Sequence, residues 1–160
     1  MTGEEPWATG RAARMTTSIR DATDQDRGAV VDLWRACDLT RPWNDPPADF
    51  RAALVNPSST VLLLTETGRA LRTEDQVLAT VLAGYDGHRG WLYYLAVDPE
   101  HRGDGHGRAL VTAAEEWLAA RGAVKVQLMV REGNPAADFY AALGYQPQAV
   151  TTWGRRLIEH

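Results

Sequence analysis

The sequence predicts a single domain of the mixed α+β class, with one central sheet, and three observations indicate this class. The chain has 160 residues, close to the usual domain size of about 100–150 residues. Apolar residues make up 44% of it and charged residues 24%, which is ordinary globular composition. Segments with strand-like apolar and β-branched runs are interspersed with segments whose apolar residues recur at helical spacing.

The first half of the chain is expected to contain three strands and two helices. The first helix is capped by Asp24 and repeats apolar residues from Val30 to Cys37 at helical spacing. The second helix stops before Asn56-Pro57, because a residue before proline disfavours helical backbone. In chain order, the elements are a strand at 17–20, helices at 24–37 and 48–55, and strands at 60–65 and 76–84.

The second half is expected to add three strands and two helices. A strand at 91–97 ends at Asp98-Pro99, and a helix with one apolar face follows Gly107 and stops near Gly122. Alternation over 124–130 predicts a strand that is apolar enough to be internal. Asn134 caps a last helix that ends before Gly144, and residues 151–158 are predicted to form a closing strand.

A glycine-rich loop, Arg102-Gly-Asp-Gly-His-Gly107, leads directly from a strand into a helix. Glycines can expose consecutive backbone amides, and a helix N-terminus adds partial positive charge, so the loop suits an anion such as a pyrophosphate. Arg102 and Arg108 flank it. The spacing fits neither the dinucleotide fingerprint G-x-G-x-x-G nor a P-loop. The alternative is a flexible connector.

The loop resembles the acetyl-CoA loop of the GNAT superfamily of acetyltransferases. The resemblance extends to Leu95-Ala-Val-Asp-Pro99 and to Asn134 with Phe139-Tyr-Ala-Ala-Leu-Gly-Tyr145, and it covers Thr17 to the C-terminus. It implies a single mixed, mostly antiparallel sheet of about six to seven strands flanked by about four helices. Within the family, residues 37–46 and 84–90 resemble the small YpeA-like bacterial subgroup.

The resemblance implies acetyl-CoA as cosubstrate and assigns residues to it. The backbone of Leu95, Ala96 and Val97 would bind the pantetheine arm and the acetyl carbonyl. Tyr140 would be the general acid toward the CoA sulfur, for which a neutral phenol is suited; packing in the core is the other interpretation. Asn134 either contacts the pantetheine or only caps its helix. The loop itself contributes Arg102, Gly103, Asp104, Gly105, His106, Gly107 and Arg108.

His106 stands where the family usually has an aliphatic residue, so its side chain is expected to face solvent or the cofactor phosphates. On the acceptor side, the loop after the first helix borders the cleft in this fold. The predicted acceptor-binding residues are Arg41, Trp43, Asn44, Asp86 and His88. A proline-stiffened turn with Trp43 folded onto the core remains open for the loop.

The general base is not specified by the sequence. Ribosomal alanine acetyltransferases of the superfamily carry a glutamate where this chain has Met129, which cannot accept a proton. Deprotonation through water, without an essential base, is also possible. The remaining candidates are Asp86, His88, Tyr93, Tyr94 and Glu132.

Composition excludes several classes of partner. A net charge of −4 gives no global basic field for nucleic acid, and the single cysteine, Cys37, excludes an internal disulfide and a cysteine-based zinc site. No metal is expected, because the four histidines are scattered. No apolar run reaches the ~20 residues of a membrane span, so a cytoplasmic location is expected.

The predicted domain covers residues 16–160, after a polar, poorly ordered lead-in at 1–15, and translation could start at Met1 or Met15. We expect an N-acetyltransferase that moves an acetyl group from acetyl-CoA to a primary amine, as a monomer or homodimer. The alternative is a non-catalytic acyl-CoA-binding sensor or regulatory module.

Overall fold

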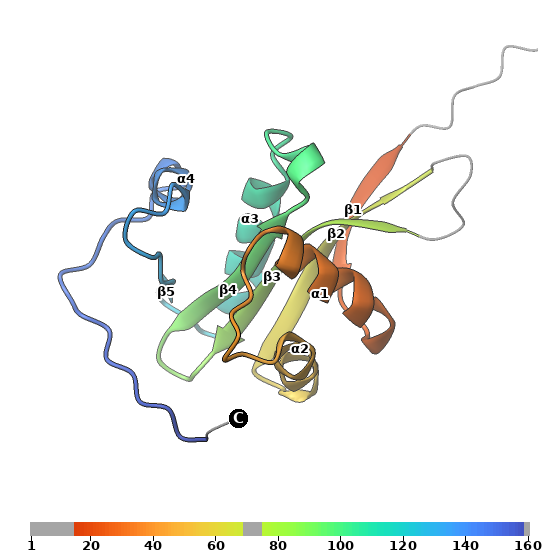
Figure 1. The fold of residues 1–160 in the computed structure, drawn as a ribbon. Coiled ribbons are helices and arrows are strands. Elements are labelled where there is room, and N and C mark those ends of the chain that lie inside the picture. The colour runs from red at the N-terminus through yellow and green to blue at the C-terminus, as the bar shows by residue number, and fades with distance from the viewer. Residues whose placement is uncertain (1–14, 69–74, 159–160) are drawn as a thin grey trace, which may run out of the picture.

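The computed structural model describes residues 15–68 and 75–158, as one sheet with helices on both faces (Figure 1). The predicted lead-in lies outside these residues apart from Met15, and so does most of the predicted loop between the strands at 60–65 and 76–84. No helix in the described ranges is long and apolar enough to cross a membrane.

The sheet has five strands in the order β1-β2-β3-β4-β5, which is also their order in the chain. The first three pairings are antiparallel, and β4 pairs with β5 in parallel. The predicted mixed, mostly antiparallel sheet of an α+β fold is therefore confirmed. The strands are β1 (Thr16–Asp21), β2 (Ser59–Thr67), β3 (Gln76–Tyr85), β4 (Gly90–Val97) and β5 (Val126–Gln127).

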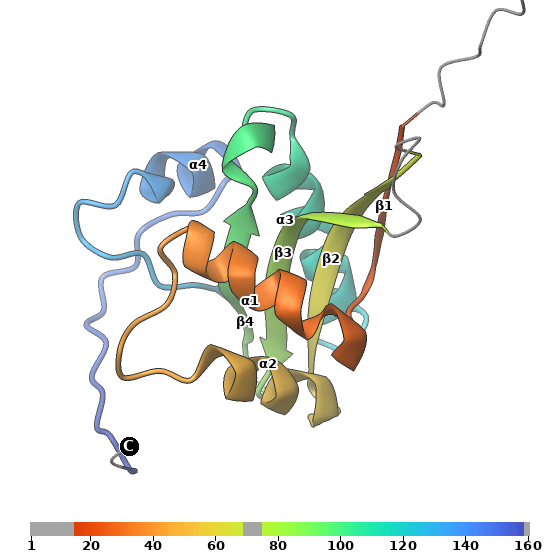
Figure 2. The ribbon, with the colours of Figure 1, turned by 45° about the vertical axis from the view of Figure 1, so that its right-hand side comes forward.

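Helices cover both faces of the sheet (Figure 2). On one face lie α1 (Arg27–Ala36) and α2 (Pro46–Val55), and on the other lies α3 (His106–Ala119). The short α4 (Ala136–Ala142) stands beside β5 at the edge of the fold. Two 3-10 turns, η1 (Asp24–Asp26) and η2 (Pro99–His101), precede α1 and follow β4.

Strand β2 joins the two hydrophobic cores because successive side chains of a strand point to opposite faces. Val61 and Leu63 pack in the core under α1 and α2, which includes Trp34 and Phe50. Leu62 and Leu64 pack in the core under α3. A strand that is apolar on both faces lies inside a three-layer arrangement, and this explains why residues 61–64 show no polar alternation.

The C-terminal third differs from the sequence prediction. The sheet has five strands in the described ranges, not six to seven. The predicted internal strand at 124–130 is reduced to Val126–Gln127 at the sheet edge, and Val124 is 85% exposed. Residues 151–158 are irregular instead of forming a strand, and Trp153 is 91% exposed. Apolar residues alternate over 124–130, but only two residues of that segment pair with β4, and 151–158 do not alternate.

Strand β4 is irregular in its second half. The register of β3 and β4 slips between the pairs Leu82↔Tyr93 and Thr80↔Ala96, and Tyr94 has φ of +51°, so the strand carries a β-bulge. Pairing of β4 with β5 ends at Trp91↔Gln127. Beyond this point the two strands diverge, which opens one edge of β4.

Candidate active site

A cavity of about 1020 Å³ opens where β4 and β5 diverge. One wall is the second half of β4, residues 91–95, and the segment after β5, residues 128–131, forms another. The α1–α2 loop and α2 contribute Arg41, Asn44 and Asp49, and Tyr140 of α4 is also in the lining. Residues far apart in the sequence thus meet around a single space.

The glycine loop before α3 has the backbone of an anion site. Gly103 and Gly105 are exposed with φ of +86° and +84°, a region that only glycine enters without strain. Gly105 is also the N-cap of α3. In the described ranges, the first amide of α3 with an acceptor inside the fold is that of Ala109, which donates to the Gly105 carbonyl at 3.0 Å. The preceding amides have no acceptor within the described ranges, an arrangement that suits an anion, and binding of a pyrophosphate by this loop stays a prediction.

Gly107 serves a different purpose from the other two glycines. It is buried, and a Cβ added there would lie 3.2 Å from the ring of Phe139 and 3.4 Å from a methyl group of Val97. A glycine at this position therefore allows α3 to approach β4 and α4 closely. The sequence assigned Gly107 to phosphate binding, and the structure adds a packing role.

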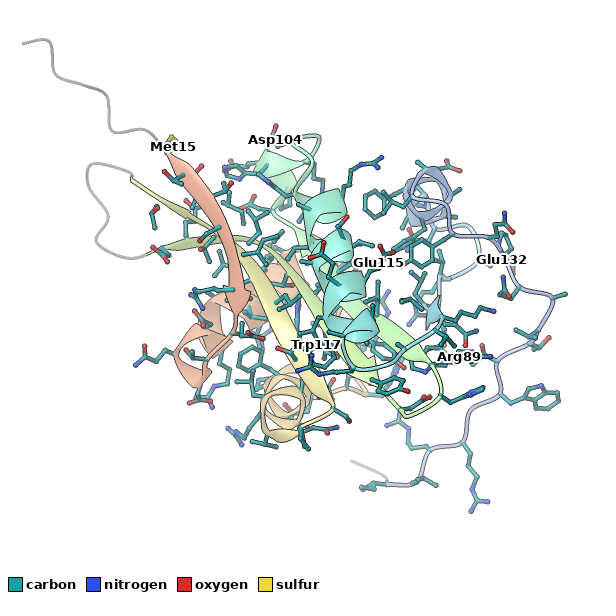
Figure 3. The ribbon with its side chains drawn as sticks, turned by 180° about the vertical axis from the view of Figure 1, so that it is seen from behind. Met15, Arg89, Asp104, Glu115, Trp117 and Glu132 are labelled. Carbon is teal, nitrogen blue, oxygen red and sulfur yellow. The ribbon has the colours of Figure 1, made fainter. Side chains whose placement is uncertain are left out.

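The charged residues of the loop lie at its surface. Arg102 and Arg108 are exposed, and the Arg102 guanidinium lies 3.4 Å from the Val97 carbonyl. Asp104 is exposed at the start of α3 (Figure 3). His106 has only 14% of its side chain exposed, with its ring centroid 6.5 Å from that of His101. The expectation that His106 faces solvent is therefore wrong, and contact with the phosphates stays a prediction.

Tyr140 lies in the cavity wall, half-buried on α4. Its ring packs edge-on against Phe139, at 5.1 Å between centroids, and against Tyr145 at 5.8 Å. Burial raises the pKa of Tyr140 to about 12, so the phenol stays protonated at neutral pH. Asn134 also lines the cavity, while its Oδ1 accepts a hydrogen bond from the Ala136 amide at 2.9 Å. The capping role expected for Asn134 is present, and its contact with pantetheine stays a prediction.

The predicted acceptor residues fall into two groups. Arg41, Asn44 and Asp86 line the cavity. Trp43, which is 51% exposed, and His88, in the β3–β4 turn, lie outside the lining. The Trp43 carbonyl accepts a hydrogen bond from Arg156 at 3.1 Å, which ties the C-terminal segment to this loop.

The candidate general bases are poorly suited to that task. The amides of Arg89 and His88 and the indole of Trp91 donate to Asp86 and lower its pKa to about 2. Burial raises the pKa of Tyr93, so this phenol holds its proton.

Tyr94 has a raised pKa as well, first through burial and then through its hydrogen bond to Asp49. Glu132 is exposed between β5 and α4 (Figure 3) and lies outside the cavity lining.

Asp49 is the cavity residue that sequence reasoning missed. The Tyr94 hydroxyl donates to its Oδ2 at 2.7 Å across 45 positions of sequence. Asp49 sits in a helix without a motif around it, so only the fold brings it to the site. No group of three or more histidine, cysteine or acidic side chains suited to a metal ion occurs within 15–68 and 75–158.

The fold and site define the class of protein. An anion-binding loop at a helix N-terminus lies next to a strand with an open edge, and a protonated phenol faces the same cavity. This combination suits a transferase that takes a group from a pyrophosphate-bearing donor whose arm runs along the strand.

Comparison with known proteins identifies the family. The profile of the Acetyltransferase (GNAT) family matches residues 28–145. An acetyltransferase of Pectobacterium atrosepticum is 42% identical over 142 residues, which are 88% of this chain and 96% of that protein. The chain therefore belongs to the GNAT family and is an acetyl-CoA-dependent acetyltransferase.

Solved structures share the fold. AAC(6')-Iy, in complex with the bisubstrate analogue CoA-S-monomethyl-acetylneamine, matches with a TM-score of 0.70 and 15% identity, over 88% of this chain and 99% of that one. A transcriptional regulator from Bacillus halodurans matches with a TM-score of 0.71 and 18% identity, over 88% of this chain and all of the other. At these identities the likeness concerns the fold alone.

Proposed function

We propose that the chain transfers the acetyl group of acetyl-CoA to a primary amine of a small molecule or protein, by direct attack of the amine on the thioester. Acetyl-CoA supplies an acetyl group already activated for transfer. The residues of this chain then have four tasks: to hold the thioester, to stabilise the developing oxyanion, to admit a neutral amine and to protonate the departing sulfur.

The cofactor tasks belong to β4 and the glycine loop. The amides of residues 103–108 bind the pyrophosphate at the start of α3, and Arg102 and Arg108 add charged donors. Leu95, Ala96 and Val97 offer backbone groups to the pantetheine arm and the acetyl carbonyl. The divergence of β5 after Trp91↔Gln127 supports this assignment, because it frees that edge of β4 from pairing.

The position of Tyr140 carries the proposal. Its phenol borders the same cavity as Leu95. Burial raises the pKa of this phenol to about 12, so it is protonated at neutral pH. The place of Tyr140 in the cavity wall, and not its raised pKa, supports the role of donating a proton to the departing thiolate.

Arg41, Asn44 and Asp86 border the acceptor side, whereas Trp43 and His88 lie outside the lining. Of the two carboxylates that the described residues contribute to the lining, Asp86 has a pKa lowered to about 2 and Asp49 already accepts the Tyr94 hydroxyl, so we assign removal of the amine proton to water.

The test measures thiol release and acetylated product from acetyl-CoA with a panel of primary amines. Tyr140→Phe should lower kcat by about 100-fold, the lower end for general acid catalysis, and leave the Kd of acetyl-CoA within twofold. Tyr145→Phe is the matched control, because its ring packs against Tyr140 while its hydroxyl donates to Glu115 on α3 at 2.7 Å. An unchanged kcat in Tyr140→Phe contradicts the acid role. CoA binding without acetylation of any amine contradicts the proposed function.

A further inference from the structure

We infer that Asp49, held in place by Tyr94, binds a second, non-reacting cationic group of the acceptor, so that the enzyme prefers amines carrying another positive charge. The inference rests on the proposed function, since it names the chemistry of the same acceptor. Asp49 then determines which acceptors are preferred, and Tyr94 positions the Asp49 carboxylate.

The carboxylate of Asp49 borders the cavity from α2. It is half-buried, and its Oδ2 accepts the Tyr94 hydroxyl at 2.7 Å. Tyr94 borders the cavity from the bulge of β4, next to the Leu95 backbone assigned to the cosubstrate. The pair therefore lies on the acceptor side of the predicted reaction centre.

Tyr94 is fixed by the core beneath it. Its ring stacks on Trp34, with 4.0 Å between centroids and 10° between planes. The Trp34 indole donates to the Thr80 hydroxyl at 3.0 Å, and that hydroxyl donates to the Tyr94 carbonyl at 3.3 Å. With its ring and its backbone both held, Tyr94 fixes the direction of the Asp49 carboxylate.

Asp49 has no basic partner within 4.0 Å among the residues that the structure describes. Arg41 borders the same cavity, but its guanidinium donates to the carbonyls of Asp38 and Thr40 at 2.8 and 2.7 Å. Arg131 enters the lining from the segment after β5. The half-buried Asp49 carboxylate has one neutral donor, the Tyr94 hydroxyl. A cation supplied by the ligand would stabilise its charge best.

The cation that pairs with Asp49 is a different group of the acceptor from the amine that reacts. An ammonium group paired with a carboxylate has a raised pKa and stays protonated, whereas the attacking nitrogen must be neutral. The hydrogen bond from Tyr94 further stabilises the charged carboxylate. Asp49 is therefore suited to a permanent counter-ion, and the reacting amine lies elsewhere in the cavity, toward Tyr140.

The experiment compares linear α,ω-diamines of three to six carbons with amino alcohols of the same lengths. The amino alcohol has one primary amine and the diamine has two equivalent ones, which gives the diamine only a twofold statistical advantage. While one amine of the diamine reacts, the other remains as an ammonium, which the amino alcohol lacks. The wild-type protein should acetylate the best diamine with a kcat/KM about 10- to 100-fold above that of its amino alcohol, the range of a charged hydrogen bond. The difference should lie in KM.

Asp49→Asn keeps an oxygen for the Tyr94 hydroxyl and removes the charge, so it should lower kcat/KM for the diamine to the level of the amino alcohol and so abolish the diamine preference. Tyr94→Phe keeps the ring on Trp34 and should weaken the preference by about threefold. The matched control is Asp32→Asn, because Asp32 is an exposed carboxylate on α1 outside the cavity lining. It should keep the full preference.

Two outcomes overturn the inference while the proposed function stands: equal wild-type kcat/KM for diamine and amino alcohol, or a preference that survives in Asp49→Asn. Equal loss of kcat for both amines in Asp49→Asn also overturns it, because that result indicates a structural role. Failure of the proposed function looks different: no amine of any kind is acetylated, although CoA binds.

Discussion

The cofactor half and the acceptor half of the proposed active site are built in different ways, and the glycine loop of the cofactor half lies outside the lining of the cavity. The cofactor half consists of contiguous backbone: β4, η2, the glycine loop and the start of α3 follow one another within residues 90–119. The acceptor half is assembled from side chains that are distant in sequence. Asp49 meets Tyr94, Trp34 meets Thr80, and Arg156 reaches the Trp43 carbonyl across 113 positions.

This difference separates recognition by backbone from recognition by side chains. A pyrophosphate is recognised by amides and a helix N-terminus, which depend on glycines at fixed spacing and hardly on other side chains. An acceptor is recognised by groups such as the Asp49 carboxylate, whose position depends on the packing beneath it. Damage to the two halves should therefore produce distinct kinetic defects.

The largest effect is expected from Trp34→Ala, which removes the ring that stacks on Tyr94 in the acceptor half. Trp34 is fully buried, stacks on Tyr94 and contacts Phe50 edge-on at 6.2 Å between centroids. The cavity left behind should lower the free energy of unfolding by about 3–5 kcal/mol, measured by urea denaturation. The milder Trp34→Phe should stay folded and raise the acceptor KM, with the acetyl-CoA KM unchanged. A loss below about 1 kcal/mol for Trp34→Ala would mean that this core does not hold Tyr94.

A smaller effect is expected from Gly107→Val, which pushes α3 away from Phe139 and Val97. Overpacking should cost about 1–3 kcal/mol of unfolding free energy and should lower kcat, because Phe139 and Tyr140 are neighbours on α4. Gly28→Val is the matched control: Gly28 is also the second residue of a helix, but a Cβ there meets nothing within 4 Å. Equal losses of stability in the two variants would show that helix propensity, and not close packing, explains Gly107.

Local patterns predicted most of the fold. Apolar spacing and turn residues located the four α-helices and the strands from β1 to β4. Most of these elements bury the apolar face that their own sequence displays, whereas β1 and α4 have no buried residue. The same patterns were wrong at 124–130 and 151–158. The alternation at 124–130 is real, but a strand also needs a partner edge, and β5 offers only two paired residues. Residues 151–158 lack such alternation. Pairing over long distances leaves no local signal.

The candidate site shows the same contrast between local sequence patterns and contacts over long distances. The loop from Arg102 to Arg108 and the motif around Tyr140 are visible in the sequence because they are contiguous. Asp49 is not visible in the sequence, because no motif around it in α2 distinguishes it from an ordinary exposed acidic residue. Tyr94 was singled out as a candidate base, and its partner changes that interpretation. The phenol keeps its proton and donates a hydrogen bond to the Asp49 carboxylate, so it is unsuited to act as a base.

The smallest effect concerns an ion pair outside both halves. Arg20 donates to both carboxylate oxygens of Asp26 at 2.8 Å, and the hydrogen bond from Arg20 is the main cause that lowers the Asp26 pKa to about 2. A depressed carboxylate pKa stabilises the fold above the unfolded value of about 3.8 and loses that contribution as pH falls through about 2. Asp26→Asn should therefore cost about 1 kcal/mol at pH 7.

The cost of Asp26→Asn should shrink as unfolding is measured at lower pH, and acetylation kinetics at pH 7 should not change. A cost that is equal at pH 7 and pH 2 would show that the charge of Asp26 is irrelevant. A raised acceptor KM would show that α1 transmits changes from this pair to the cavity, which would weaken the separation of the two halves.

A crystal structure of the protein with bound CoA tests the central claim most directly. We predict the pyrophosphate within hydrogen-bond distance, about 3 Å, of the amides between residues 103 and 108. The pantetheine should run along β4 at Leu95–Val97, and the sulfur should lie within reach of the Tyr140 hydroxyl. A pantetheine arm that leaves the β4–β5 opening, or a Tyr140 hydroxyl turned away from the sulfur, would contradict the account.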